Sequence, residues 1–229
     1  DAEAGGWDGA TLGRAVREEY EGHLDDLGLL DAGAPANTPA VLRAVREALP
    51  EETVVTTDIG GFRLWASQGF PAHEPAGYVT AGSWAGMGVG LPAALGAKLA
   101  RPERPVACLH GDGGLLMCLQ ELHTAVQEDL DLTLVVFNNH DYGTISKSPK
   151  IAQYAGGSRF EWESPDFAAI AAGFGCRGET VETPAGARAA VEDSLDRDGV
   201  DVVVVEVATD EPSVNDGADY EPSVDPTDY

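Results

Sequence analysis

The sequence predicts an α/β fold of three layers, in which helices cover both faces of a mostly parallel sheet. Short apolar runs typical of buried strands alternate with segments that carry apolar residues at helical spacing. This alternation of strand and helix is typical of a parallel sheet that is covered on both faces. At 229 residues, the chain is also long enough to bury a sizeable core.

The compact domain is expected to span residues 37–210. Residues 1–36 are acidic and glycine-rich and are predicted to form a lead-in or linker with one helix near 11–20. Residues 211–229 form an acidic tail with six carboxylates and no basic residue, which is predicted to be disordered or to drape over the surface. The missing initiator methionine suggests a processed chain or part of a longer one.

Within the domain, helices are predicted from start signals and helical spacing, and strands from apolar runs. The elements are, in chain order, a helix from Asn37-Thr38-Pro39, a strand over 53–57, a helix over 62–66, a helix over 93–100, a strand over 106–109, a helix through Leu115, Leu119, Leu122 and Ala125, a strand over 132–137, helices from Ser164-Pro165 and Thr183-Pro184, and a strand over 202–207. The glycine-rich segment 81–92 is either a tight helix-packing face or a wall for a flat ligand.

The charge of the chain is strongly negative, with 39 acidic and 14 basic residues and a formal net charge of −25. Such a surface repels nucleic acid and anionic membranes, so neither is an expected partner. A solvated surface suited to high salt, as in halophilic proteins, is favoured over an acidic binding face for a basic partner.

The cysteines indicate a reducing compartment. There are three, an odd number, and two lie in apolar contexts, so buried free thiols are favoured over a disulfide framework. The sequence has no Cys-x-x-Cys spacing, which argues against a zinc or iron-sulfur site. It also has no apolar run near the length of a membrane span and no signal-peptide pattern, so we expect a soluble, cytoplasmic protein.

Two polar turns follow neighbouring strand candidates. Asp112 lies in Gly111-Asp112-Gly113-Gly114 after the first strand, and Asn139 ends an Asn-Asn pair after the second. Backbone N–H groups at such a glycine turn can hold phosphate oxygens, and a carboxylate beside phosphate requires a cation between the two. Magnesium, with its preference for oxygen ligands, suits Asp112 and the Asn139 carbonyl. The turn has no lysine, which argues against a P-loop. Each motif alone is more often a structural turn, but the pair favours a site.

These residues resemble the thiamine diphosphate enzymes of the acetolactate synthase and 2-oxo acid decarboxylase group, and in particular their C-terminal diphosphate-binding domain. The family signature is Gly-Asp-Gly followed, after a spacer of the length seen here, by Asn-Asn. The resemblance covers roughly Pro39 to Val207 and includes Thr57-Asp58-Ile59-Gly60, the run from Met87 to Ala94, and Glu121 to Ala125.

The resemblance implies roles for individual residues. Metal ligands would be Asp112, the side-chain oxygen of Asn139 and the main-chain oxygen of Asp141. Thiamine diphosphate would be bound by Ile59, Gly60, Gly61, Ala85, Met87, Gly113, Gly114, Tyr142 and Gly143. Among these, Met87 resembles the apolar prop that holds the cofactor bent, and the main-chain oxygen of Ala85 matches the acceptor for the aminopyrimidine.

The resemblance also implies that this chain holds only part of an active site. The family uses a catalytic glutamate from a pyrimidine-binding domain, often on a neighbouring subunit, and residues before 39 are too few to form that domain. Glu121 reads as structural, so no catalytic residue is assigned here. The chain would be the C-terminal domain of a longer enzyme, which the missing methionine favours, or the small subunit of a split 2-oxo acid decarboxylase. A homo-oligomer, at least a dimer, is expected.

The substrate is left open by the sequence. Thr144 and Ile145 are the candidates for the substrate pocket, and Ser148 belongs to the same wall. Acetolactate synthases are expected to have methionine near Thr144 and tryptophan near Ser148, and pyruvate-type decarboxylases a glutamate near Ile145; none of these is present. Two rival functions are a non-catalytic module that binds a nucleotide or a partner, and an acidic scaffold without a ligand.

Overall fold

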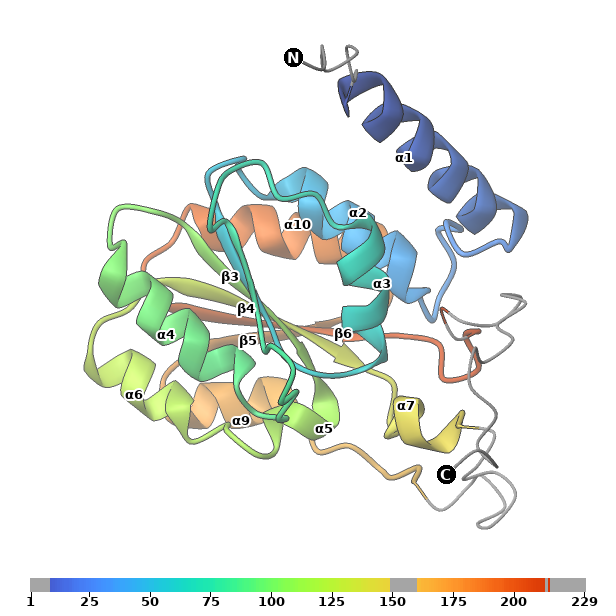
Figure 1. Ribbon diagram of the computed structural model, residues 1–229. Coiled ribbons are helices and arrows are strands. Elements are labelled where there is room, and N and C mark those ends of the chain that lie inside the picture. Colours follow the sequence, from blue (N-terminus) through green and yellow to red (C-terminus); the bar gives the residue numbers. More distant parts are fainter. Residues whose placement is uncertain (1–8, 149–159, 213, 215–229) are drawn as a thin grey trace, which may run out of the picture.

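The computed structural model describes residues 9–148, 160–212 and 214, and its centre is a six-stranded sheet (Figure 1). The strands lie in the order β2-β1-β3-β4-β6-β5, and every neighbouring pair is parallel. Their bounds are β1 Val54–Thr57, β2 Tyr78–Thr80, β3 Val106–Gly111, β4 Leu132–Asn138, β5 Arg177–Val181 and β6 Val200–Glu206. The predicted α/β class is therefore confirmed.

Helices cover both faces of the sheet, which completes three layers (Figure 1). One face carries α2 (Thr38–Ala48), α3 (Gly61–Gly69) and α10 (Pro184–Leu195). The opposite face carries α4 (Gly90–Ala100), α5 (Asp112–Leu115), α6 (Glu121–Gln127) and α9 (Phe167–Phe174). Each face has its own apolar cluster, with valines and leucines of β3 and β4 contributing to both because successive side chains point to opposite faces.

Helices begin at or near the predicted starts, but the caps differ: Asn37 makes no side-chain capping hydrogen bond, and α9 is capped by Asp166 in place of Ser164. Asp166 accepts a hydrogen bond from the Ala169 N–H at 2.9 Å in front of α9. Thr183 accepts one from the Gly186 N–H at 3.1 Å in front of α10, whose first residue is a proline without an N–H to satisfy.

Three features differ from the elements predicted. The helix expected through 115–125 is divided into α5 and α6, and hydrogen bonds to residues three positions back form the turn between them. The strand β5 was not predicted because its residues are polar and exposed at the sheet edge. The strand β2 was not predicted because it has only three residues, also at an edge.

The segment before residue 37 contributes to the core. Its helix α1 (Gly9–Asp26) stands at the side of the sheet, and Leu24 and Leu29 are buried in the cluster of the α2 face (Figure 1). Ala36 pairs with Val207 in an isolated parallel bridge. The boundary at residue 37 stays a prediction. Among the residues described, no helix has the length and apolar character needed to cross a bilayer. All three cysteines are buried and free, as predicted.

Candidate functional site

A cavity of about 650 Å³ lies at the carboxyl edge of the sheet. The chain passes from β1 to β2 on one side and then to β3 on the other, and such a reversal leaves a crevice at the carboxyl ends of the strands. Every predicted site residue lines this cavity: Ile59, Gly60, Gly61, Ala85, Met87, Asp112, Gly113, Gly114, Asn139, Asp141, Tyr142, Gly143, Thr144 and Ile145. The structure thus brings these residues together, while their roles in binding stay predictions.

Asp112 is a buried carboxylate at the end of β3. It is the first residue of α5 and is 3% exposed. Its Oδ1 accepts a hydrogen bond from the Gly113 N–H at 2.8 Å, and its Oδ2 accepts one from the Ser164 hydroxyl at 3.3 Å. Burial raises the pKa of Asp112 to about 6, against the effect of hydrogen bonds from Gly113, Ser164 and His140. A cation beside this carboxylate would therefore relieve an unfavourable burial of charge.

Asn139 and Asp141 lie in the turn that follows β4. The neighbouring strand β3 pairs Gly111 with Phe137, so Asp112 and Asn139 leave the sheet at the same edge. Asp141 is buried; its Oδ2 accepts a hydrogen bond from Ser146, but its Oδ1 has no hydrogen-bond partner among the described residues. A buried carboxylate oxygen without a partner is costly, and it indicates room for a further polar group at this point.

The two glycines after Asp112 are required by close packing. A Cβ on Gly113 would lie 2.5 Å from the Tyr142 ring, and a Cβ on Gly114 would lie 2.2 Å from Asp58 Oδ2. The Gly113 N–H, predicted to face a phosphate, donates to Asp112 in this structure. The Asp112 carboxylate therefore stabilises the turn in which it lies.

The glycine-rich segment 81–92 forms a loop over 81–89 and the first residues of α4. Its end packs closely, whereas its interpretation as a wall for a flat ligand stays a prediction. Gly90 packs so closely on Asp58 that a Cβ would lie 2.8 Å from the Asp58 nitrogen. Ala85 and Met87, by contrast, face the cavity. Ala85 has a φ of 49°, in the left-handed region that side chains rarely adopt, so the surrounding loop must fix this conformation.

The available oxygen ligands suit a hard cation. Within the described residues, histidine, cysteine, aspartate and glutamate form no cluster of three or more that could hold a metal ion. A metal here would therefore need the Asn139 amide oxygen and a main-chain carbonyl beside the Asp112 carboxylate. Magnesium accepts that ligand set, usually together with phosphate oxygens and water.

Comparison with known proteins agrees with this geometry. The family described as "Thiamine pyrophosphate enzyme, C-terminal TPP binding domain" matches residues 58–207, which is more than half of the chain. The chain belongs to this family. Its match covers the strands and turns that carry Asp112 and Asn139.

Relatives of this TPP-binding domain include enzymes of several activities. The acetolactate synthase isozyme 1 large subunit of Escherichia coli is 32% identical over 188 residues, which cover 80% of this chain and 34% of that protein. The sulfoacetaldehyde acetyltransferase of Castellaniella defragrans is 37% identical over 145 residues, 62% of this chain and 24% of that protein. The chain thus spans about a third or less of the length of these relatives.

A solved structure shares the fold of the TPP-binding domain. The thiamine diphosphate-dependent 4-hydroxybenzoylformate decarboxylase of Rhodococcus jostii RHA1 superimposes with a TM-score of 0.73 at 26% identity. The match covers 80% of this chain and 34% of that protein. The region shared with these relatives therefore extends beyond the residues of the family match, over the larger part of the chain.

Two residues that organise the site of the TPP-binding domain had no predicted role. Asp58 is fully buried and accepts hydrogen bonds from the N–H groups of Gly88, Val89 and Gly90 at 2.8–3.1 Å, which fixes the loop that carries Met87. Its position directly after a buried strand and before two glycines is a signal that could have identified it. The Ser164 hydroxyl lies within hydrogen-bond distance of the side chains of Asp112 and Asn138. In the sequence, this serine indicates only a helix start, so its contact with the site was not predicted.

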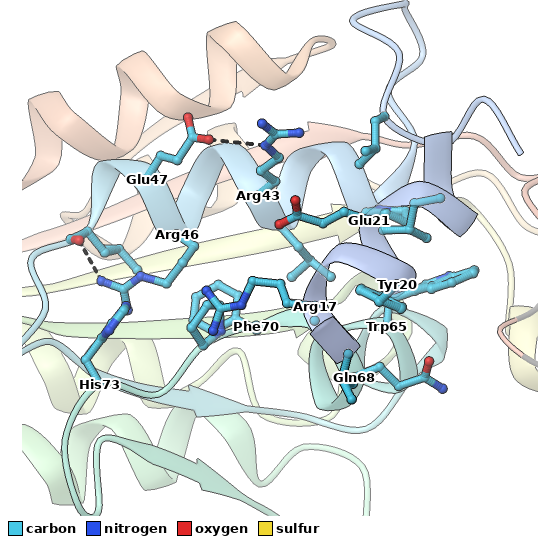
Figure 2. A pocket seen from close by; sticks show the side chains of 18 of the residues that line it. Arg17, Tyr20, Glu21, Arg43, Arg46, Glu47, Trp65, Gln68, Phe70 and His73 are labelled. Atoms are coloured by element: carbon cyan, nitrogen blue, oxygen red, sulfur yellow. Dashed lines mark hydrogen bonds and ion pairs between the residues drawn. The ribbon is translucent and has the colours of Figure 1, made fainter. Parts of the chain in front are cut away.

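A second cavity of about 600 Å³ lies between α1, α2 and α3 (Figure 2). Its lining includes arginines and glutamates in equal number: Arg17, Arg43, Arg46, Glu21, Glu47 and Glu51. The Arg46 guanidinium lies 5.5 Å from the Phe70 ring centroid and donates to the carbonyls of Leu49 and Pro50. No predicted site residue lines this second cavity, and its balanced charges favour no class of ligand.

Proposed function

We propose that this domain binds the diphosphate group of TPP together with Mg²⁺ at the carboxyl ends of β3 and β4, within an enzyme that decarboxylates or joins 2-oxo acids. One observation carries the proposal. The buried carboxylate of Asp112 and the amide of Asn139 follow adjacent parallel strands beside a glycine turn, at the wall of a 650 Å³ cavity. When bound, TPP would supply an electron sink for the bond that breaks or forms at the substrate's own carbonyl carbon.

The roles of the chain's own residues follow from their positions. Asp112, the Asn139 side chain and the main-chain oxygen of Asp141 would hold the metal ion, and the unpartnered Oδ1 of Asp141 supports a further polar group nearby. The diphosphate would lie against the backbone at Gly113, Gly114 and Gly143, and against Ile59, Gly60 and Gly61. None of these residues needs to move a proton, because their task is to bind and orient.

The loop with Ala85 and Met87 would support the rings of the cofactor. Asp58 fixes the end of that loop through three N–H groups, so Met87 is carried on a rigid support. Met87 would hold the cofactor bent by geometry alone, and the main-chain oxygen of Ala85 would accept a hydrogen bond from the pyrimidine. The fixed loop supports these roles because a prop must resist displacement.

A pyrimidine-binding domain is the partner that this site requires, from the same longer chain or from another subunit. It would supply the catalytic glutamate, since no catalytic residue is assigned in this chain. Trp84 is 96% exposed and Met117 is 51% exposed beside the glycine-rich loop. A Cβ on Gly88 would lie 3.1 Å from the Met117 Cβ, so the glycine-rich loop packs against the turn between α5 and α6. The exposed apolar side chains of this loop and this turn would suit an interface with the partner domain. An assembly of at least two copies is part of this proposal, for a site that a neighbouring subunit completes.

Two further predictions about the whole enzyme remain. A cytoplasmic location is supported by three buried free thiols, which a reducing compartment preserves. Adaptation to high salt is supported by the net charge of −25. The substrate stays open between small and aromatic 2-oxo acids, since Thr144 and Ile145 are both exposed in this domain.

A calorimetric titration tests the proposed function. The chain together with its pyrimidine-binding domain is titrated with TPP in the presence of Mg²⁺ and, separately, in the presence of a chelator. We expect binding that needs Mg²⁺, that Asp112→Ala abolishes, and that the exposed control Asp193→Ala leaves unchanged. Binding of nucleoside diphosphates in place of TPP would favour the non-catalytic module, and equal binding without Mg²⁺ would refute the metal site.

A further inference from the structure

The segment that follows β6 forms one wall of the cofactor cavity. Its residues Val207, Ala208, Glu211, Pro212 and Val214 line the same cavity as Thr144 and Ile145. The Thr209 hydroxyl donates to the Asn139 carbonyl at 2.9 Å, which fastens the segment to the turn after β4. Glu211, Pro212 and Val214 of this wall lie beyond residue 210, outside the predicted compact domain.

Glu211 is a buried carboxylate within this wall. It is 9% exposed, and its Oε2 accepts a hydrogen bond from the Thr38 N–H at 2.6 Å. Thr38 is the first residue of α2, whose N-cap residue Asn37 makes no side-chain capping hydrogen bond. Glu211 therefore caps a helix that begins 173 residues earlier in the chain. The positive end of the helix dipole favours a carboxylate there.

A second contact joins Glu211 to the other side of the cavity. Lys147, directly after α7 (Gly143–Ser146), donates from its ammonium group to the Glu211 main-chain carbonyl. Burial raises the pKa of Glu211, while Thr38 and Lys147 act in the opposite direction. One residue thus connects the segment after β6 with α2 through its side chain and with α7 through its backbone.

We propose that Glu211 is a positioning residue that fastens residues 208–212 and Val214 as the substrate-side wall, and so limits the size of the 2-oxo acid that the site accepts. It acts through Pro212 and Val214, which line the cavity, and does not itself react. The part concerning substrate size rests on the proposed function. The fastening itself rests on the contacts with Thr38 and Lys147 alone.

Hydrogen exchange tests the fastening without any turnover. The variants are Glu211→Ala, which removes the cap; Glu211→Gln, whose carbonyl can still accept from Thr38; and the exposed control Glu103→Ala. A buried hydrogen bond to a charged group lowers the equilibrium constant for local opening, and hence the rate of amide exchange, by about tenfold or more. We expect exchange at the Thr38 amide to rise about tenfold in Glu211→Ala, less in Glu211→Gln, and not in the control. Unchanged protection in Glu211→Ala would overturn the proposal.

Substrate selectivity of the assembled enzyme tests the consequence. The measured quantity is the ratio of kcat/KM for benzoylformate to that for pyruvate. Opening the wall should shift the ratio toward the bulkier substrate by about tenfold in Glu211→Ala and little in Glu211→Gln. A merely structural role would lower both values in parallel, and that result would overturn the role in selectivity. A wild-type enzyme that turns over no acid in a panel of small and aromatic 2-oxo acids would refute the proposed activity, while exchange still decides the fastening.

Discussion

We expect the buried charge of Asp112 to lower the stability of the metal-free protein, and the variant Asp112→Asn tests this. Burial raises the pKa of Asp112 from 3.8 to about 6. The folded protein therefore holds the proton more tightly than the unfolded chain, and it loses stability as the pH rises from about 4 to 6. A shift of about two units corresponds to about 3 kcal/mol of destabilisation above pH 6 in the metal-free protein.

Replacement by asparagine removes the charge and keeps the shape. Its carbonyl can still accept from the Gly113 N–H, and the Ser164 hydroxyl can accept from the new amide. We therefore expect Asp112→Asn to raise the free energy of unfolding at pH 8 by up to about 3 kcal/mol, or Tm by up to about 6 to 12 °C. The gain should fall below about 1 kcal/mol near pH 4, where the folded carboxyl is protonated and the unfolded one is protonated in roughly half of the molecules.

Thermal and urea unfolding between pH 4 and 8, in the presence of a chelator, measure the difference. The exposed control Asp193→Asn should follow the wild type at every pH. Addition of Mg²⁺ and TPP at a thousand times Kd should reverse the order, because only the wild type gains binding energy, about 4.1 kcal/mol. A metal-free variant that is less stable than the wild type at pH 8 would show that burial does not penalise this carboxylate.

Three other predictions concern packing, assembly and thiol chemistry. Gly114→Ala should destabilise the fold by about 3 kcal/mol or more in urea unfolding, since its Cβ would lie 2.2 Å from Asp58 Oδ2, whereas Gly96→Ala in the open face of α4 should stabilise it slightly. Trp84→Ala should weaken assembly with the pyrimidine-binding domain at least tenfold in analytical ultracentrifugation, with Tm unchanged. Burial raises the pKa of all three cysteine thiols, so a thiol reagent at pH 8 should label them only after unfolding.

The fold could be predicted where the local signal and the tertiary environment agree. The strands β3 and β4 are buried along nearly their whole length, so their residues form uninterrupted apolar runs. The strand β5 pairs with β6 at the sheet edge and is largely exposed, so no apolar run marks it. Its place in the sheet follows from backbone pairing, which leaves no trace in a pattern of side chains.

The candidate site could be predicted where consecutive residues carry it. Asp112 and Asn139 stand out because each lies directly after a strand, within a short motif. The residues that support them lie far apart in sequence: Ser164 is 52 positions from Asp112, and Glu211 is 173 positions from Thr38. Such pairs become visible only once the chain is folded, because nothing local distinguishes a serine that starts a helix from one that also bonds a buried carboxylate.

The charges around the cavity explain why a cation is central to the proposed function. Asp112, Asp141 and Glu211 line it, and Lys147 is the basic residue among the described lining. The whole chain, these residues included, has a formal net charge of −25. A diphosphate would be repelled from such a site, and the one lysine is already bonded to the Glu211 carbonyl. A divalent ion changes the sign of that interaction, since it attracts both the carboxylates and the diphosphate. In this protein, the metal would therefore decide whether an anionic cofactor can enter at all.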